Sequence, residues 1–195
     1  RALLNTAEVA HQDVPGLSQF ILSLIAPNAT IAATGETRVV DGVALEFQIV
    51  SGSEAPSELN VYLPAQRTFL SAEMSTCSLH NILTPRGALV RNAQRWSGYL
   101  DEALTLYGGR SDQLVSSHCW PRFGNAAVRD HLAVQRDNYK FLHDQAVRLM
   151  NNGETPPEIA SALESQRVPP TLRSARASCG VRTAPAPSRR SRATT

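Results

Sequence analysis

The sequence predicts a mixed α/β fold in which the strands come first and the C-terminal part is helical. Three observations lead to this prediction. Short runs between residues 37 and 72 alternate apolar with polar side chains, a helical period starts near residue 96, and a longer helical period occupies residues 125–152. The 195 residues suffice for one domain of ordinary size, and 42% hydrophobic with 18% charged residues is the composition of a globular protein.

The predicted strands form an antiparallel meander. Residues 43–49 have the two-residue period of a half-buried strand, and the Asp-Gly pair just before them is a hairpin signal that makes residues 37–40 the preceding strand. Further runs rich in β-branched and aromatic residues lie at residues 59–63 and 68–72, with a turn between them. Close spacing of these runs favours pairing between sequence neighbours.

Helices dominate the rest of the chain. Apolar residues at spacings of three and four predict a helix over residues 96–107, ended by a Gly-Gly pair. After a short strand at residues 113–116, a long helix is predicted over residues 125–152, and a proline-capped segment predicts a short helix at residues 158–164. The apolar stripe of the long helix packs either on the chain's own sheet or across a twofold axis.

Both ends of the chain differ from this body. Residues 1–30 have no amphipathic period and leave room for one short helix around residues 17–25. The apolar stretch Phe20–Ala26 is too short to cross a bilayer, so a transmembrane protein is excluded. The chain starts at Arg1 without an initiating Met, and we expect that preceding sequence, including any signal that sets localisation, is missing.

The positive charge of the chain belongs to a tail. Residues 173–195 contain six arginines and no acidic residue, so the formal net charge of +2 leaves about −4 for residues 1–172. A body without excess positive charge argues against nucleic acid as a partner. The tail consists almost wholly of Arg, Ala, Ser, Thr and Pro, which predicts a disordered segment, with out-of-frame translation as another origin of this composition.

Three residues at the ends of predicted strands suit a metal ion. Glu54 and Glu73 lie where strands give way to loops, nineteen residues apart, and His118 occupies a third such position. Zn²⁺ accepts carboxylate and imidazole ligands, and loops at strand ends can bring them together. On spacing alone, a solvated surface position is the more common role of such residues.

The cysteine content argues against a disulfide framework, because the number of cysteines is odd and their spacing is not that of a metal finger. The three cysteines are Cys77, Cys119 and Cys179.

The sequence around these residues resembles the metallo-β-lactamase superfamily, and specifically its alkyl sulfatase branch. SGSEAPSELNVYLPAQRTFLSAEM, residues 51–74, has the pattern of a ligand-bearing loop, a strand, a tight turn and a strand that ends in a bridging acid. Glu at both ligand positions, in place of His and Asp, is similar to the alkyl sulfatases. The resemblance covers roughly residues 30–172. Its segments, in order, are GETRVVDGVALEFQIVSGSEAPSELNVYLP, LHNILTPRGA, WSGYLDEAL, HCWPRFGN and DQAVRLMNNGETPPEIASALE.

This resemblance implies a function and a site. Members of the branch hydrolyse linear primary alkyl sulfate esters, such as dodecyl sulfate, to alcohol and sulfate at a two-zinc site. By position, Glu54 would ligate one zinc ion, Glu73 would bridge both, and His118 would ligate the second. Asn81 and Arg86 would bind the sulfate group, because arginine offers charge-assisted and often bidentate hydrogen bonds to such oxyanions.

The resemblance also implies a domain organisation. Residues 1–124 correspond to the C-terminal part of the catalytic domain, which is the second half of an αββα sandwich. Residues 125–172 correspond to the start of an all-helical dimerisation domain, so a homodimer is expected for the full-length protein. Residues 173–195 are the disordered basic tail.

The chain departs from the family pattern in its ligand set. The H-x-H-x-D-H motif that supplies the remaining zinc ligands is absent from the 195 residues and would lie upstream of Arg1. Met74 stands where the family commonly has Asn, and Cys77 where it frequently has His. Cys119, next to His118, is expected to be a small packed hydrophobe, with opportunistic metal binding as the alternative. We therefore expect the chain alone to be incomplete and inactive.

Two other functions remain open at this point. One is a metallo-hydrolase of the same fold that acts on another ester, although Asn81 and Arg86 favour sulfate. The other is a noncatalytic remnant that at most dimerises, which the missing ligands and the abrupt tail favour. Half a sandwich also leaves strand edges unpaired, so we expect weak or no independent folding. Among the other histidines, His80 is expected to be structural or exposed. His11, His131 and His143 are expected to be solvated.

Overall fold

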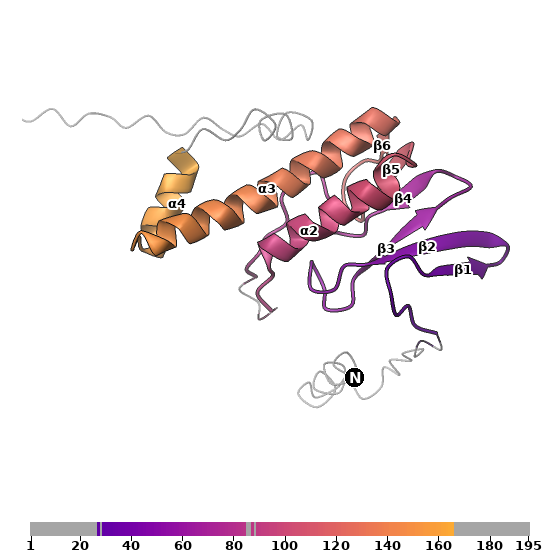
Figure 1. The fold of residues 1–195 in the computed structure, drawn as a ribbon, viewed down its shortest axis with the longest axis horizontal. Helices are drawn as coiled ribbons and strands as arrows, with labels where there is room; N and C mark the ends of the chain where they lie inside the picture. Colours follow the sequence, from indigo (N-terminus) through magenta and orange to yellow (C-terminus); the bar gives the residue numbers. More distant parts are fainter. Residues whose placement is uncertain (1–26, 28, 85–86, 88, 166–195) are drawn as a thin grey trace, which may run out of the picture. The chain divides into compact units, whose positions relative to one another are not determined.

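A computed structural model of the protein describes residues 27, 29–84, 87 and 89–165 (Figure 1). The segment considered for a helix at residues 17–25, the sulfate-binding candidate Arg86 and the basic tail lie outside these residues. The chain divides into two compact units, residues 1–30 and 31–195, and every element below belongs to the second.

The strands form one six-stranded mixed sheet in the order β1-β2-β3-β4-β5-β6. All neighbours pair antiparallel except β4 and β5, which are parallel. The predicted meander is thus confirmed for β1 to β4. The β1–β2 hairpin turns through Asp41 and Gly42, whose φ angles of 50° and 80° are the left-handed values that a two-residue hairpin of type I′ requires. The strands are β1 (Thr37–Val40), β2 (Val43–Ile49), β3 (Leu59–Leu63), β4 (Thr68–Leu70), β5 (Gln113–Val115) and β6 (Arg122–Phe123).

The helices confirm the predicted mixed α/β class. They are α2 (Ala93–Ala103), its π-helical continuation η2 (Leu104–Gly108), α3 (Asn125–Asn151) and α4 (Pro156–Ser165). Helix α2 begins three residues before the predicted start because the side chain of Asn92 caps it, accepting a hydrogen bond from the N–H of Arg95 (3.0 Å). The described helices include none with the length and apolar composition of a membrane span.

Helices α2 and α3 lie side by side over the sheet (Figure 1) and close the hydrophobic core against it. Trp96 of α2 is fully buried and stacks on Tyr139 of α3, with ring centroids 4.8 Å apart. The stripe on the first half of α3 is part of the same core, so it packs within the chain. The core residues are Val50, Tyr62, Phe69, Met74, Trp96, Leu100, Ala103, Tyr107, Leu114, Val128, Leu132 and Tyr139.

A buried amide network fixes α2 to the middle of the sheet. Gln48 of β2 donates from Nε2 to the carbonyl of Tyr99 (2.9 Å) and to the carboxylate of Glu102 (2.7 Å). Asn60 of β3 donates to Oε1 of Gln48 (2.9 Å). Because Gln48 and Asn60 are fully buried, loss of either partner would leave a polar group without compensation.

His131 of α3 is buried, and the expectation that it is solvated is wrong. It is 6% exposed, and its Nε2 lies 3.2 Å from the carbonyl oxygen of Ser75. Burial, together with the positive charge of Arg122, lowers the pKa of His131 to about 4. The imidazole is therefore neutral at physiological pH and acts as a hydrogen-bond partner of the backbone.

We expect the free energy of unfolding to fall as the pH drops from 6.5 to about 4. In the unfolded chain His131 takes up a proton near pH 6.5, and in the folded chain near pH 4, so acid favours unfolding between these values. The loss reaches about 3 kcal/mol. Urea unfolding across this pH range measures it. His131→Gln keeps a side-chain N–H donor without a titratable group and should remove this part of the slope, and equal slopes for both proteins would contradict the assignment.

Candidate metal centre

Three loops meet at one edge of the sheet, and each carries a residue singled out from the sequence. Strands β2, β4 and β5 run in the same direction, since β3 is antiparallel to both β2 and β4, and β5 is parallel to β4. Their C-terminal ends therefore lie at the same edge. Glu54 follows β2, Glu73 follows β4 and His118 follows β5.

Glu73 is the centre of this group. Its Oε1 lies 3.2 Å from Nε2 of His118, and its Oε2 lies 3.1 Å from Nε2 of His80. The carboxylates of Glu54 and Glu73 and the imidazole of His80 each offer a ligand atom, and these atoms lie within 4.8 Å of one another. The structure thus brings Glu54, Glu73 and His118 together and adds His80.

His80 has a more specific position than the sequence suggested. Its side chain is largely buried, with 17% exposed, and its ring stacks on that of Trp96 with the ring centroids 5.7 Å apart. Its backbone N–H donates to the hydroxyl of Tyr139 (2.9 Å). The core aromatics therefore hold His80 in place against Glu73. Its sequence signal was the spacing of seven residues from Glu73 within a single loop.

Glu58 aligns the two loops that carry the carboxylates. Its Oε2 accepts hydrogen bonds from the N–H of Glu54 (2.6 Å) and from the hydroxyl of Ser53 (2.7 Å). Its Oε1 accepts one from the N–H of Glu73 (2.8 Å). One side chain thus fixes the backbone of both Glu54 and Glu73. Sequence reasoning missed this residue, because a glutamate just before β3 has no pattern that separates it from a solvated one.

Arg91 is a second positioning residue that sequence reasoning missed. Its side chain is 3% exposed and donates to Oε1 of Glu54 (2.6 Å). Through Nη1 it also donates to Oδ1 of Asn81 (2.7 Å) and to the hydroxyl of Thr84 (2.7 Å). Thr84 itself donates to Oδ1 of Asn81 (2.7 Å). With its oxygen engaged twice, the exposed side chain of Asn81 presents its Nδ2 amide as a donor.

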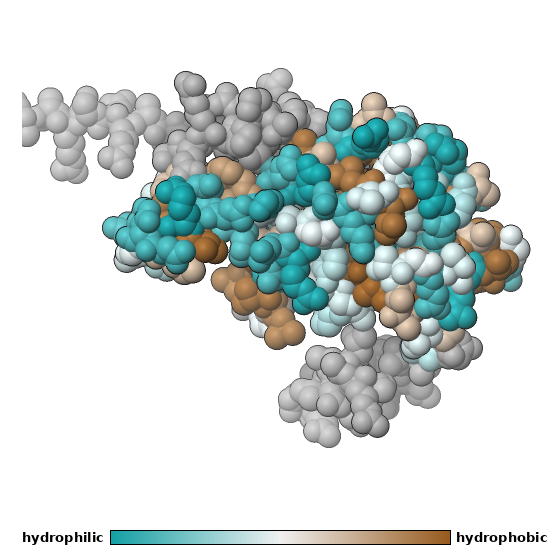
Figure 2. Space-filling view, viewed as in Figure 1, coloured by the Kyte–Doolittle hydropathy of each residue, from teal (hydrophilic) through white to brown (hydrophobic). Residues whose placement is uncertain are grey.

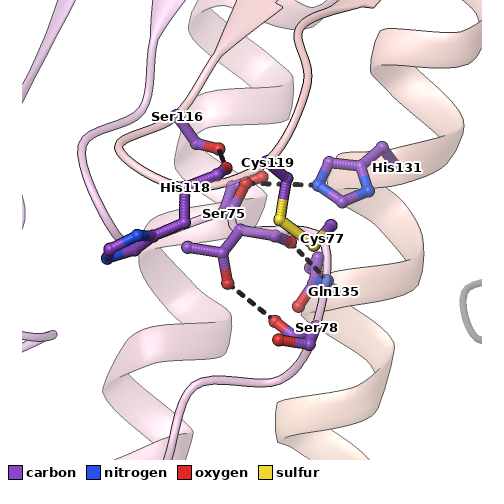
Figure 3. Close-up of a disulfide and its surroundings, with 9 residues drawn as sticks. Ser75, Cys77, Ser78, Ser116, His118, Cys119, His131 and Gln135 are labelled. Carbon is purple, nitrogen blue, oxygen red and sulfur yellow. Dashed lines mark hydrogen bonds between the residues drawn. A yellow bond between two sulfur atoms is a disulfide. The ribbon is translucent and has the colours of Figure 1, made fainter. Parts of the chain in front are cut away.

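A disulfide between Cys77 and Cys119 joins two of the three loops (Figure 3). The expectation of no disulfide, and of a packed or metal-binding Cys119, is therefore wrong. An odd number of cysteines did not exclude one pair, and the parallel β4–β5 pair brings together loops that are 42 residues apart. Cys179 lies outside the described residues.

Apolar side chains are exposed on the loop that precedes α2. In Figure 2 hydrophobic colour gathers over this loop, which contains Leu83, Leu89 and Val90, exposed by 64%, 80% and 69%. The loop after β5 adds Trp120, which is 92% exposed. Both loops also carry candidate site residues, Asn81 and His118. Polar donors and exposed apolar surface thus lie on the same segments.

The donor set suits a divalent ion of the zinc type. Carboxylate oxygens and imidazole nitrogens are the ligands such an ion takes. Glu54, Glu73 and His80 bring three of them within 4.8 Å of one another, and His118 adds a fourth next to Glu73. The contacts of Glu58 and Arg91 behind the carboxylates resemble the outer hydrogen bonds that orient metal ligands. The arrangement supports metal binding next to a donor for an anion.

Comparisons with known proteins identify one group of relatives. The chain is 50% identical over 139 residues to an (R)-specific secondary-alkylsulfatase from Pseudomonas sp, covering 71% of this chain and 21% of that protein. It is 43% identical over 143 residues to a linear primary-alkylsulfatase from Pseudomonas sp, covering 73% of this chain and 21% of that protein. No protein-family model matches the chain.

A solved structure agrees with these relatives. The stereoselective inverting sec-alkylsulfatase Pisa1 from Pseudomonas sp. superposes with a TM-score of 0.71 at 48% identity, over 75% of this chain and 23% of that structure. The chain therefore spans about a fifth of the length of the curated relatives it matches. Over this partial region it is homologous to the alkylsulfatases.

Replacement of Arg91 by Met should lower the free energy of unfolding by about 3 kcal/mol, since it leaves a partly buried carboxylate without its partner. Glu54 and Asn81 both lose hydrogen bonds to the guanidinium. Urea unfolding compares this variant with Arg95→Met, which removes an exposed guanidinium on α2. A similar small loss in both variants would show that the ion pair does not hold the site together.

Proposed function

We propose that this chain is the part of an alkylsulfatase that supplies three metal ligands and the sulfate-binding residues, and that the protein hydrolyses alkyl sulfate esters to alcohol and sulfate. The observation that carries the proposal is the meeting of Glu54, Glu73 and His118 at one sheet edge, in a region homologous to the alkylsulfatases. Relatives named for secondary and for primary esters both match, so linear primary esters such as dodecyl sulfate are one candidate class.

Two zinc ions are the proposed cofactor. Glu54, Glu73 and His118 would hold them together with ligands from outside these 195 residues, and His80 is a further donor within reach of Glu73. A bound zinc ion supplies Lewis acidity, which makes water a nucleophile near neutral pH. Glu58 and Arg91 would keep the two carboxylates oriented before the ions arrive, which lowers the cost of ordering them on binding.

The sulfate group would be held by Asn81 and Arg86. The Nδ2 amide of Asn81 is directed by the two hydrogen bonds that its oxygen accepts, so it can donate to a sulfate oxygen. Arg86 follows five residues later in the sequence and would add a charge-assisted bond. Leu83 and Leu89, exposed on the loop that precedes α2, would offer apolar surface to the alkyl chain.

The proposed domain division rests on the resemblance to the alkyl sulfatases. Residues up to 124 would be the second half of an αββα metallo-β-lactamase sandwich, and α3 and α4 would begin a helical dimerisation domain. The first half of α3 packs in the core of this chain, so its later turns and α4 are the part available to a second copy. By itself the chain would lack ligands and be inactive.

Zinc titration of the chain tests the site without relying on activity. We expect Glu73→Gln to weaken zinc binding more than tenfold, because it removes the carboxylate that contacts both His80 and His118. We expect Glu58→Gln to weaken it by about tenfold, because an amide keeps a single acceptor oxygen and cannot accept from the N–H groups of both loops. The matched control is Glu164→Gln, an exposed glutamate on α4. Equal affinities in all four proteins would place the metal elsewhere.

Sulfate release tests the substrate. The chain alone should release no sulfate from dodecyl sulfate or from 2-octyl sulfate, whereas a longer protein that includes an upstream H-x-H-x-D-H motif should hydrolyse at least one of them. Glu73→Gln in the longer protein should abolish release. Stoichiometric zinc with hydrolysis by the chain alone would overturn its proposed incompleteness, and loss of neither activity nor zinc in Glu73→Gln would overturn the site.

A further inference from the structure

We propose that the disulfide between Cys77 and Cys119 is a positioning element that holds His118 against Glu73, and that its reduction weakens metal binding at this site. The effect on metal binding rests on the proposed function. The positioning of His118 is a property of the chain without metal, and it follows from the contacts of the two loops.

The disulfide joins the loops at the points where they carry the candidate ligands. Cys77 lies between Glu73 and His80 in the loop after β4, and Cys119 directly follows His118 in the loop after β5. The two Cα atoms are 5.9 Å apart across a separation of 42 residues. Figure 3 shows His118 on the side of the disulfide that faces away from α3.

The Cys77 side of the bond is anchored to α3. The Nε2 of His131 lies 3.2 Å from the carbonyl of Ser75, and Nε2 of Gln135 donates to the carbonyl of Thr76 (3.0 Å). Both helical residues are buried. The backbone immediately before Cys77 is thus fixed to α3, the longest of the described helices (Figure 3), and the disulfide connects the other loop to this part.

The loop of His118 has fewer anchors. One residue before it, the N–H of Ser117 donates to the carbonyl of Ala72 (2.8 Å), and one residue after it the disulfide follows. Cys119 is exposed and has a φ of 76°, a left-handed value that costs energy for a residue with a Cβ. With the disulfide broken, the described ties between the two loops near His118 are the hydrogen bond of Ser117 and the contact of His118 with Glu73 itself. The hydroxyl of Ser116 also donates to the carbonyl of His118 (2.5 Å), but this bond stays within one loop.

Reduction of this bond is chemically accessible. The S–S bond takes up two electrons and two protons and gives two thiols, while a dithiol reductant becomes a disulfide. Cys119 is an exposed residue, which favours the approach of a thiolate to the bond. Exposed disulfides are commonly the labile, regulatory ones. The pair would therefore make metal loading depend on the thiol redox state.

His80 provides a contrast within the same site. It reaches Glu73 from the same loop, stacks on Trp96 and donates its backbone N–H to Tyr139. None of these described contacts passes through the disulfide. Reduction should therefore release His118 and leave His80 next to Glu73.

Zinc affinity of the oxidised and reduced chain tests this inference in a Cys179→Ser background, where the pair supplies all the cysteines. Peptide mapping without reductant first establishes the bond. The reductant is a trialkylphosphine, because dithiols chelate zinc. The phosphine reduces the pair, takes oxygen from water to become the phosphine oxide, and is then removed under exclusion of air. We expect reduction to weaken zinc binding by about tenfold. The Cys77→Ser/Cys119→Ser variant should match the reduced chain and not respond to the phosphine.

Two histidine variants separate positioning from general loss of structure. His118→Ala should weaken zinc binding in the oxidised chain and have little further effect after reduction, whereas His80→Ala should weaken it by the same factor in both forms. Unpaired cysteines in the map, or an affinity that is unchanged or higher after reduction, would overturn the inference. If neither form binds zinc, the metal ions need the ligands from outside these residues, and amide hydrogen exchange of residues 116–120 decides the positioning: faster exchange after reduction supports it, and equal exchange overturns it.

Discussion

The rest of this structure depends on the contacts that the indole ring of Trp96 makes. It is fully buried between the helices and the loop after β4, stacked on Tyr139 and His80, and its Nε1 donates to the carbonyl of Met74 (2.8 Å). One side chain therefore joins α2, α3 and the segment that carries Glu73. A ring of this size combines a large apolar surface with a single polar group that needs a partner, so it sets position as well as burial.

Two residues that would not touch a metal hold the candidate site in place. Glu58 and Arg91 hold the carboxylates of two different loops, and the sheet aligns the strand ends from which these loops leave. The polar contacts are short and partly buried, which strengthens them but makes each one costly to lose. A substitution of Glu58 or Arg91 would therefore disturb the candidate ligands without removing any of them.

Local patterns were sufficient to predict most of the fold. Alternation over residues 43–49 and the Asp-Gly pair define the β1–β2 hairpin, and the helical period places α3 almost to the residue, because these signals depend on neighbours in sequence. The burial of His131 and the pairing of Cys77 with Cys119 depend on the packing of distant segments, and no local pattern reports that. The grouping of Glu54, Glu73 and His118 was expected from family resemblance, whereas their spacing alone favoured surface positions.

The parallel pair of β4 and β5 has a consequence for how the chain is made. Strands β1 to β4 pair with sequence neighbours and can form as soon as they leave the ribosome, but β5 returns to β4 only after α2 and η2 have crossed over. Contacts of long sequence separation form late. During this interval β4 is an open edge that another nascent chain can join. The time for which this edge is exposed during synthesis would then limit the yield of native protein more than the stability of the finished fold does.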